Sequence, residues 1–559
     1  MNNKRNIILE EYENEFSYKK SKTNLDIQFN RIAFIFFVFL MISVIYSIQL
    51  LHLGSLKSDF QTNYTASVKD YRADIIDRNG NYLVKTVSSI DIGISPIEVI
   101  DKQKLLINLR WIFPEKDYAE VEKKLNKNKF FKFEKTISSI NYQKIMSLGD
   151  KAIRPEEKLT RIYPQKNLFS HIVGQIDNEN NGISGLEKSF DKELKQRKKP
   201  LQLTVDTDIQ FLIREELVKF QSIFRSKGSA AILMNVNNGE IISMVSYPDF
   251  DLNKREKIVD LNFINRATKG VYELGSVFKT FTVAAGLEEG LIDIDTEFLN
   301  LEKRLKCGKS NITEYDDKIP SDLTVEQILI RSGNIGSVRI GQRLEINKLK
   351  AFLEKIGILN KIKFDIEEIG EPIPFKWGKC KLATVSYGHG ITTTPLQLAK
   401  AYAIISNGGF DVEPSLVKKD LENYQQKKRI IKIGISEKIN AILRKIVATK
   451  EGTAGLANID GYEVGGKTGT AQKTTIGGYS RRKKVNTFAG IFPVSNPKYV
   501  LIVLFDEPKT SPDYVYKYKN KKGTYKGTPF NTAGWTSVEV AGKIIEKIGP
   551  ILATKHMEN

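Results

Sequence analysis

Three short motifs follow one another along this chain, and each contains residues that could take part in acyl transfer. They are Ser276-Val277-Phe278-Lys279, Ser332-Gly333-Asn334 and Lys467-Thr468-Gly469-Thr470. A serine hydroxyl becomes a nucleophile when a neighbouring base takes its proton. Ser-x-x-Lys alone is a weak signal, since it also begins at Ser17, Ser189, Ser415, Ser480 and Ser495. The interpretation therefore rests on the order of the three motifs and on their surroundings.

The first motif is predicted to lie at the start of a helix. The string FKTFTVAAGLEEG follows Val277, which predicts about three helical turns with Lys279 one turn after Ser276. An ordinary lysine, with a pKa of about 10.4, is protonated at neutral pH. We expect burial, the helix dipole and the ammonium of Lys467 to lower the pKa of Lys279 by about three units, so that it can act as the base. The alternative is a surface serine and lysine on one helix.

The second motif is predicted to form a loop between helical runs. The hydroxyl of Ser332 could relay a proton toward a leaving group, and the amide of Asn334 could hold a peptide carbonyl. Both residue types are also common at helix N-termini, so an ordinary helix cap is the competing interpretation. If the motif is functional, it should lie on the wall of a cleft opposite the third motif.

The third motif is predicted to lie in a strand. Gly469 lacks a side chain, so another backbone could approach closely and pair with the strand. Lys467, Thr468 and Thr470 supply a cation and two hydroxyls that suit a carboxylate. A phosphate-binding loop is excluded because the spacing is not Gly-x-x-x-x-Gly-Lys-Thr. The backbone amides of Ser276 and Thr470 could form an oxyanion hole.

Residues 32–51 contain no charged side chain. At 1.5 Å per residue a helix of this length spans roughly 30 Å, so we expect a membrane-spanning helix over residues 32–53. A cleaved signal peptide is less consistent with a run this long that lacks a small-residue cleavage site. Basic residues are denser before the span than after it: Lys19, Lys20, Lys22 and Arg31 against Lys57 and Lys69. This bias predicts a cytoplasmic tail over residues 1–31 and export of the remainder.

Composition narrows the class of protein. The 559 residues are 41% hydrophobic, which predicts two or three packed domains. A net charge of +20 could favour nucleic acid, but no zinc-finger spacing, RNA-binding string or basic helix is present, so no nucleic-acid partner is expected. Cys307 and Cys380 are the only cysteines and could form one bond. The four histidines lack ligand spacing, so neither a metal nor a cofactor is expected.

The pattern along the chain predicts two exported domains. Residues 54–200 form the first, β-rich, with a hairpin that turns at Asn79-Gly80, a helical subdomain over 96–149 and a basic linker at 195–199. The second, residues 201–559, begins with a strand at 203–206 that enters a helix, and a hairpin over 230–246 follows. Helices fill 262–459, strands return at 463–472, 487–494 and 499–505, and a helix closes the chain at 532–548. This is an α+β arrangement, with a mainly antiparallel sheet completed by distant segments.

The chain resembles a class B penicillin-binding protein, a single-pass peptidoglycan D,D-transpeptidase. The first domain carries RADIIDRNG, RIYP and GISGLE, and the second carries NRATKGVYELGSVFK, YGHGITTTPLQLA, SNGG, GKTGTAQK and FAGIFP. The resemblance implies a penicillin-binding/β-lactamase-like transpeptidase domain on a pedestal domain. It also implies roles for the motif residues: Ser276 as nucleophile, Lys279 as base, Ser332 and Lys467 in proton transfer, Asn334 in peptide binding, Thr468 and Thr470 with Lys467 on the donor carboxylate, and Gly469 beside the substrate strand. Lys166 and Leu274 depart from the usual glycine and proline.

Related enzymes differ by features that this chain lacks. A bifunctional synthase needs a glycosyltransferase domain before the transpeptidase, and about 150 residues are too few for it. No Glu-x-x-Leu-Asn string follows Ser332, so the acyl-enzyme is expected to await an amine. The resemblance implies stem peptides ending in D-Ala-D-Ala and nascent glycan as substrates, β-lactams as inhibitors, and a SEDS-type glycan polymerase and division proteins as partners. GVYELGSVFK favours septal synthesis in the inner membrane, with side-wall synthesis or a non-catalytic scaffold as alternatives. The basic stretches 480–484 and 514–526 are expected to be solvated loops.

Overall fold

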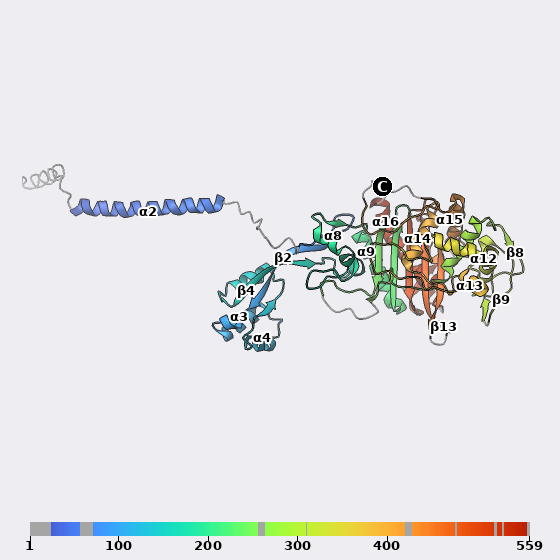
Figure 1. The fold of residues 1–559 in the computed structure, drawn as a ribbon, viewed down its shortest axis with the longest axis horizontal. Helices are drawn as coiled ribbons and strands as arrows, with labels where there is room; N and C mark the ends of the chain where they lie inside the picture. The colour runs from blue at the N-terminus through green and yellow to red at the C-terminus, as the bar shows by residue number, and fades with distance from the viewer. Residues whose placement is uncertain are drawn as a thin grey trace, which may run out of the picture. The chain divides into compact units, whose positions relative to one another are not determined.

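The computed structural model describes residues 24–55, 71–254, 263–308, 310–419, 428–475, 478–518, 523–527 and 530–555. The chain divides into two compact units, residues 1–68 and 69–559. The first unit contains the long helix α2 (Asn24–Ser55, Figure 1). Its stretch Arg31–Leu51 is strongly apolar, and its apolar side chains are exposed. It has the length and composition of a membrane-spanning helix. Five basic residues that flank the predicted span lie outside the described residues: Lys19, Lys20, Lys22, Lys57 and Lys69.

The second unit begins with a sheet in which β3, β2, β1 and β5 are neighbours in that order and β4 pairs with β2. Its elements are β1 (Ile75–Ile76), β2 (Tyr82–Ile94), α3 (Lys102–Ile112), α4 (Tyr118–Leu125), β3 (Phe131–Glu134), α5 (Ser139–Met146), β4 (Ile153–Ile162), α6 (Ser170–Val173), α7 (Gly185–Ser189), α8 (Asp191–Gln196) and β5 (Leu201–Gln202). Strands β1 and β2 form the predicted hairpin around Asn79-Gly80. The predicted helical subdomain contains α3 to α5, and β3 lies between α4 and α5.

A buried ion network joins the three motifs of this first domain. Glu187 Oε2 accepts a hydrogen bond from Arg72 Nε at 2.5 Å, and Glu187 Oε1 accepts one from Arg161 Nε at 2.8 Å. All three side chains are almost fully buried. A buried carboxylate between two guanidinium groups is costly to break, because removal of one partner leaves an uncompensated charge. Segments far apart in the sequence are therefore held together here.

Lys166, which stands where the family pattern usually has glycine, adopts a backbone conformation that glycine favours. Its φ is +52°, in the left-handed region where glycine is favoured and where a residue with a side chain is strained. The backbone at this position therefore keeps the conformation that a glycine would adopt.

The junction between the two predicted domains that follow α2 differs from the prediction in two places. Lys195 lies in α8 and pairs with Asp191 at 2.9 Å, so the predicted basic linker begins as a helix. The strand expected at 203–206 is instead β5, which pairs in parallel with β1. Asp206 caps the next helix, because its carboxylate accepts hydrogen bonds from the backbone of Asp208 and Ile209.

The remainder of the chain builds an antiparallel sheet with the order β12, β13, β14, β6, β7. Its elements are α9 (Thr207–Phe224), β6 (Gly228–Asn235), β7 (Ile241–Tyr247), α10 (Lys279–Glu288), β8 (Glu297–Phe298), β9 (Arg304–Cys307), β10 (Ser310–Thr313), β11 (Leu323–Thr324), α11 (Val325–Ile330), α12 (Asn334–Lys355), α13 (Lys379–Val385), α14 (Pro395–Ser406), α15 (Ile433–Ala448), β12 (Gly465–Thr475), β13 (Gly478–Phe492), β14 (Tyr499–Asp506), β15 (Val515–Tyr518), β16 (Gly523–Lys526) and α16 (Ser537–Lys555). Strand β14 pairs with β6, so green and orange strands lie side by side in Figure 1. The predicted sheet completed by distant segments is confirmed.

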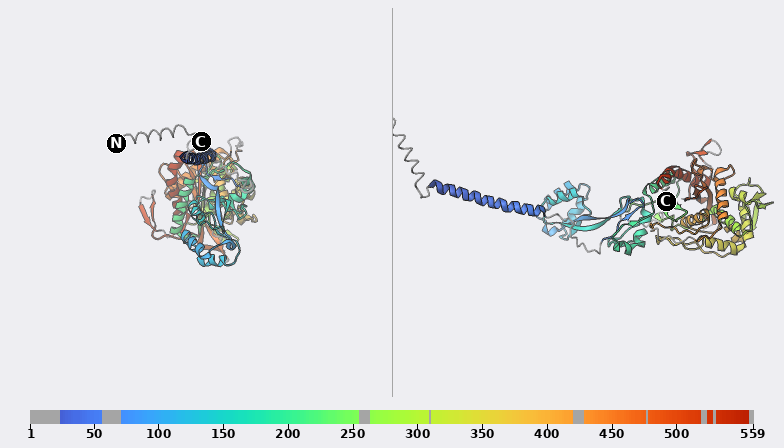
Figure 2. Two further views of the ribbon diagram at one scale, coloured as in Figure 1. Left: turned by 90° about the vertical axis from the view of Figure 1, so that its left-hand side faces the viewer. Right: turned by 90° about the horizontal axis from the view of Figure 1, so that it is seen from above.

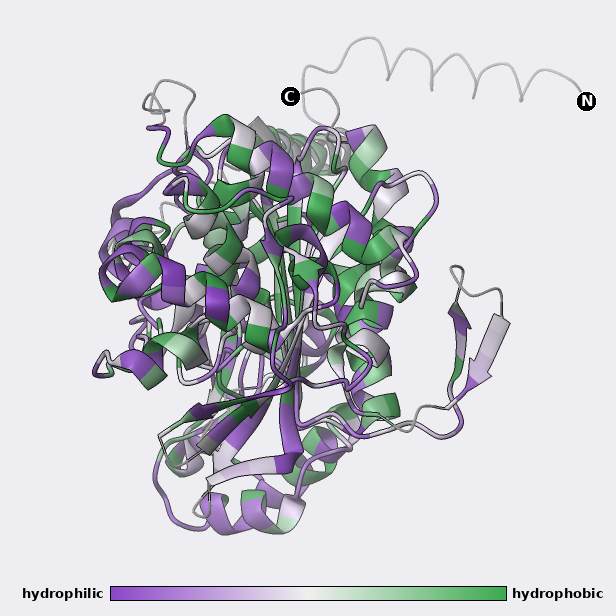
Figure 3. Cartoon of the chain, turned by 90° about the vertical axis from the view of Figure 1, so that its right-hand side faces the viewer, coloured by the Kyte–Doolittle hydropathy of each residue, from purple (hydrophilic) through white to green (hydrophobic). Residues whose placement is uncertain are grey.

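The prediction of loops is wrong for residues 480–484 and for the described residues 515–518 and 523–526, all of which lie in strands. Residues 480–484 lie in β13, because the hairpin of β12 and β13 continues beyond the core sheet and pairs Gln472 with Lys484. Strands β15 and β16 form a second hairpin. It projects from the body of the domain (Figure 2) and is mainly hydrophilic, whereas apolar residues gather on the central strands and the helices around them (Figure 3).

Candidate active site

Ser276 lies on a tight turn that leads directly into a helix, as predicted. The turn is a short 3-10 segment (Gly275–Phe278), and α10 follows from Lys279. Ser276 is partly exposed, while Lys279 is fully buried. Gly275 has φ +65°, and a Cβ there would lie 2.9 Å from the carbonyl oxygen of Thr470. A side chain would therefore separate the serine turn from the third motif.

The amine of Lys279 lies among oxygen atoms of the second motif. Its Nζ donates to the carbonyl oxygen of Ser332 at 2.5 Å, to Asn334 Oδ1 at 2.7 Å and to Ser332 Oγ at 3.2 Å. Burial lowers the pKa of Lys279 to about 7, and the carboxylate of Glu314 opposes this shift. The predicted lowering by about three units is confirmed, with burial as its main cause.

Lys467 reaches the same hydroxyl from strand β12. Its Nζ donates to Ser332 Oγ at 2.8 Å and to the carbonyl oxygen of Thr468 at 3.3 Å, and the side chain is fully buried. Burial, and then the charge of Lys279, lower the pKa of Lys467 well below its ordinary value. The sequence predicts that the ammonium of Lys467 lowers the pKa of Lys279. In the structure the effect runs the other way, because the charge of Lys279 disfavours the ammonium of Lys467.

Ser332 is buried and adopts a left-handed backbone conformation, with φ +58°. Helix α12 begins at Asn334, its cap residue is Gly333, and no side chain of the cap residue bonds the first turn. The carboxylate of Glu314 accepts those hydrogen bonds instead, from the backbone N–H of Asn334 at 2.7 Å and of Ile335 at 2.8 Å. The interpretation of Ser332 as an ordinary helix cap is therefore wrong. Strain at a buried polar residue of this kind is common at functional sites.

The third motif lies on β12, which is the edge strand of the described sheet. A Cβ on Gly469 would lie 2.1 Å from the carbonyl oxygen of Leu274, so the close approach that this glycine permits is made by the turn before Ser276. Thr468 Oγ1 contacts Thr453 Oγ1 at 2.7 Å, and Thr470 Oγ1 accepts a hydrogen bond from the backbone of Ala533 at 3.0 Å. The structure thus brings all three motifs together.

Several neighbours of the motifs were not identified from the sequence. Glu273 accepts a hydrogen bond from the hydroxyl of Tyr479 at 2.9 Å, and burial raises the pKa of Glu273. The ring of His389 lies 5.4 Å from that of Tyr479. Burial lowers the pKa of His389 to about 4, and the charge of Lys279 contributes. The YGHG string that contains His389 could have pointed to this loop, whereas Glu314 and Thr453 lie in no recognisable motif.

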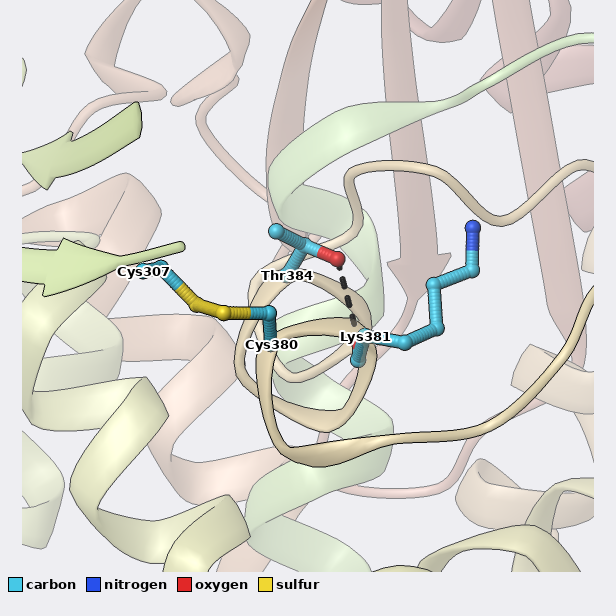
Figure 4. The surroundings of a disulfide bond; sticks show 4 residues. All are labelled: Cys307, Cys380, Lys381 and Thr384. Carbon is cyan, nitrogen blue, oxygen red and sulfur yellow. Dashed lines mark hydrogen bonds between the residues drawn. A yellow bond between two sulfur atoms is a disulfide. The ribbon is translucent and has the colours of Figure 1, made fainter. Parts of the chain in front are cut away.

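The two cysteines, whose pairing the sequence left open, form a disulfide. Cys307 ends β9 and Cys380 lies in α13, with their Cα atoms 5.3 Å apart. Lys381 extends from the other side of α13 (Figure 4). Its Nζ donates to the carbonyl oxygen of Gly390 at 2.5 Å. Helix α13 therefore connects the hairpin of β9 and β10 with the loop that carries His389.

A cavity of about 610 Å³ lies elsewhere, where residues 170–185 meet residues 263–269 and Glu368. None of the eight predicted site residues lines it. The chemistry of the three motifs, and not the volume of this cavity, therefore identifies the candidate site.

Comparisons with known proteins agree with this geometry. The family model described as the penicillin binding protein transpeptidase domain matches residues 229–528, and the one described as the penicillin-binding protein dimerisation domain matches residues 67–221. A probable peptidoglycan D,D-transpeptidase FtsI of Caulobacter vibrioides is 30% identical over 505 residues, covering 88% of this chain and 83% of that protein. Stage V sporulation protein D of Bacillus subtilis is 30% identical over 490 residues, covering 78% and 74%.

A solved structure shares the fold. The crystal structure of penicillin binding protein 3 from Mycobacterium tuberculosis, complexed with aztreonam, matches with a TM-score of 0.64 and covers 88% of this chain and 97% of that one. The identity is 21%, so the likeness concerns the fold. It confirms the predicted combination of a first, pedestal-type domain with a transpeptidase domain.

Proposed function

The chain belongs to the penicillin-binding proteins that carry a dimerisation domain followed by a transpeptidase domain, and on this premise we propose that it crosslinks peptidoglycan during septal cell-wall synthesis. One observation carries the proposal. Ser332 Oγ lies between the amines of Lys279 and Lys467, and Lys279 follows Ser276 by one helical turn, so a nucleophile, a base and a proton relay share one site.

In the first half of the reaction, Ser276 Oγ attacks the carbonyl carbon between the two D-Ala residues of a stem peptide. Lys279, with a pKa of about 7, is about half neutral at pH 7 and takes the hydroxyl proton. The amide C–N bond breaks, and the nitrogen of the terminal D-Ala takes a proton delivered through Ser332. The backbone amides of Ser276 and Thr470 stabilise the oxyanion. An ester on Ser276 and free D-Ala result.

In the second half, the side-chain amine of another stem peptide attacks the ester. Its proton passes to Lys279, the ester C–O bond breaks, and Ser276 regains its hydrogen. Asn334 holds the donor peptide in both halves, whereas Lys467, Thr468 and Thr470 hold the carboxylate of the terminal D-Ala only in the first half, until D-Ala leaves. Among the described strands only β13 pairs with β12, and the other edge of β12 receives the peptide as an added strand. A penicillin would acylate Ser276 in the same way and leave slowly, which makes the enzyme serine-type and penicillin-sensitive.

We place the catalytic domain outside the cytoplasmic membrane, in the periplasm, with the N-terminus in the cytoplasm and α2 as the single span. The apolar stretch Arg31–Leu51 and the excess of basic residues before it support this orientation. The substrates are stem peptides on nascent glycan. A SEDS-type glycan polymerase and division proteins are the proposed partners, which would supply new strands to the site.

A fluorescent penicillin tests the core of the proposal. It should label the wild-type protein and fail to label Ser276→Ala, and equal labelling of the two would overturn the assignment. The purified protein should crosslink stem peptides in vitro, and the variants Lys279→Met and Lys467→Met should not. This result would exclude the alternative that the protein is a non-catalytic scaffold. A fluorescent fusion at midcell is expected for the septal role, whereas a side-wall pattern would show an elongation enzyme.

A further inference from the structure

Glu314 stands behind the second motif without belonging to it. It follows strand β10, is half-buried, and precedes Asn334 by 20 residues. Its two carboxylate oxygens accept hydrogen bonds from the backbone of Asn334 and Ile335, at 2.7 and 2.8 Å. A carboxylate on the first N–H groups of a helix satisfies donors that have no partner within the helix and interacts favourably with its dipole. The position of the first turn of α12 is therefore set from outside the helix.

The side chain of Asn334 is held from the same segment. Its Nδ2 donates to the carbonyl oxygen of Thr313 at 2.8 Å, which turns Oδ1 toward Lys279. Oδ1 then accepts the hydrogen bond from Lys279 Nζ at 2.7 Å. An amide has distinct donor and acceptor ends, so the contact with Thr313 decides which end Lys279 meets. Two consecutive residues thus hold both the backbone and the side chain of Asn334.

The charge of Glu314 acts on the same lysine. It favours the ammonium of Lys279, against the effect of burial. The other charged or titratable groups that act on Lys279 or are acted on by it are Lys467 on β12 and His389 in the loop after α13. The charge of Glu314 also helps burial to raise the pKa of Tyr315, and the charge of Arg331 opposes this rise. The pKa of His389 is about 4 and the pKa of Tyr315 is about 12, so neither group titrates between pH 5.5 and 9.

The segment that carries Glu314 is itself anchored. Ile312, on β10, is buried in the core, and β10 pairs with β9. The disulfide between Cys307 and Cys380 fixes the end of β9 to α13. Glu314 therefore extends from a hairpin that is fastened to the domain by packing and by a covalent bond.

We propose that Glu314 is a positioning residue of the acylation site, which holds the first turn of α12 and the Asn334 amide against Lys279. The inference rests on the proposed function, because it concerns the acylation of Ser276. Glu314 acts through Asn334 and Lys279. It should therefore govern both the rate of acylation and the pH at which Lys279 becomes a base.

Three variants test the inference: Glu314→Gln, Glu314→Asp and the control Asp317→Asn, which removes a charge from an exposed residue three positions along the same loop. The acylation rate with a fluorescent penicillin is measured from pH 5.5 to 9, beside the melting temperature. Glutamine offers one carbonyl oxygen to two N–H groups, so we expect a fall of about tenfold in the maximal rate. Without the negative charge the ammonium of Lys279 is less favoured. The acidic limb of the pH–rate profile, which is the pH range where the rate rises as Lys279 loses its proton, should therefore move to lower pH.

Glu314→Asp keeps the charge on a shorter side chain. It should keep the acidic limb at the wild-type pH while lowering the rate, and Asp317→Asn should change neither. A Glu314→Gln variant with the wild-type rate and limb would overturn the inference. So would a lower rate with an unmoved limb, since that assigns Glu314 a merely structural role. Failure of the proposed function would give a different result, because the fluorescent penicillin would then label the Ser276→Ala variant as strongly as the wild-type protein.

Discussion

Lys279 and Lys467, from a helix and from an edge strand, reach the same oxygen atom, Ser332 Oγ, at 3.2 and 2.8 Å. Two buried ammonium groups at this separation repel each other strongly, so one of them is neutral. The neutral amine has a lone pair and can accept the hydroxyl hydrogen of Ser332. A proton can therefore pass between the two lysines through one hydroxyl, without water.

The rate of acylation should depend on the protonation of Lys279. The base must be neutral, and its pKa is about 7, so the rate should rise about tenfold per pH unit below pH 7 and level off above it. Lys279→Arg, which stays protonated, should lose acylation by about three orders of magnitude. Stopped-flow labelling with a fluorescent penicillin measures both effects.

Lys543→Gln serves as the control for this profile. Lys543 is a surface lysine on α16 that pairs with Glu546 at 3.1 Å. Its removal changes the net charge by the same amount and should leave the acidic limb in place. An acidic limb near pH 10 in the wild-type protein would contradict the lowered pKa of Lys279.

Gly469→Ala should separate the edge strand from the serine turn. The added Cβ would lie 2.1 Å from the carbonyl oxygen of Leu274, a backbone atom that cannot rotate away. We expect acylation to fall by about a hundredfold while most of the folding stability remains. Gly434→Ala, where a Cβ meets nothing within 4 Å, should keep the wild-type rate. Equal rates in the two variants would show that the packing of β12 on the turn is unimportant.

Glu187→Gln should destabilise the first domain. Arg72 keeps its pair with Asp191 at 2.7 Å, but an amide at position 187 cannot neutralise Arg161, whose guanidinium stays buried. We expect the free energy of unfolding to fall by about 3–5 kcal/mol, measured by denaturant titration. Glu193→Gln breaks only an exposed pair with Arg197 and should cost less than about 1 kcal/mol. A similar cost in both variants would argue against the buried network.

Reduction of the disulfide should weaken the hairpin that carries Glu314. Loss of the bond between Cys307 and Cys380 should cost about 2–4 kcal/mol of stability, read as a lower melting temperature in reductant. The double variant Cys307→Ser with Cys380→Ser should melt at this lower temperature with and without reductant. A wild-type protein whose melting temperature ignores reductant, although two free thiols titrate, would contradict this expectation.

The sequence predicted the parts of the site that repeat a local pattern. Ser276 begins a helix with Lys279 one turn on, and the hairpin at Asn79-Gly80 has a turn that any Asn-Gly pair favours. The antiparallel sheet could also be predicted, because apolar strands at both ends of the second domain need a common core.

Features that depend on contacts distant in sequence could not be predicted. In the sequence Glu314 has no feature that distinguishes it from a surface glutamate. Only the fold places its carboxylate at the start of α12. The basic residues at 480–484 were interpreted as a loop, because a run of charged residues lacks the alternation of apolar and polar residues that indicates a strand. Their strand forms because they pair with the neighbouring strand β12. The effect of Lys279 on Lys467 required knowing how deeply each amine is buried.

At Gly275 and Gly469 the serine turn and β12 approach each other mainly through backbone atoms. A Cβ on Gly275 would meet the backbone of Thr470, and one on Gly469 would meet the carbonyl of Leu274 first and the side chain of Val277 at 3.1 Å. No side chain there can be exchanged to alter the fit gradually, because any Cβ is either strained or too close to a carbonyl group. The fit of the serine turn on β12 can therefore change only if the backbone itself moves.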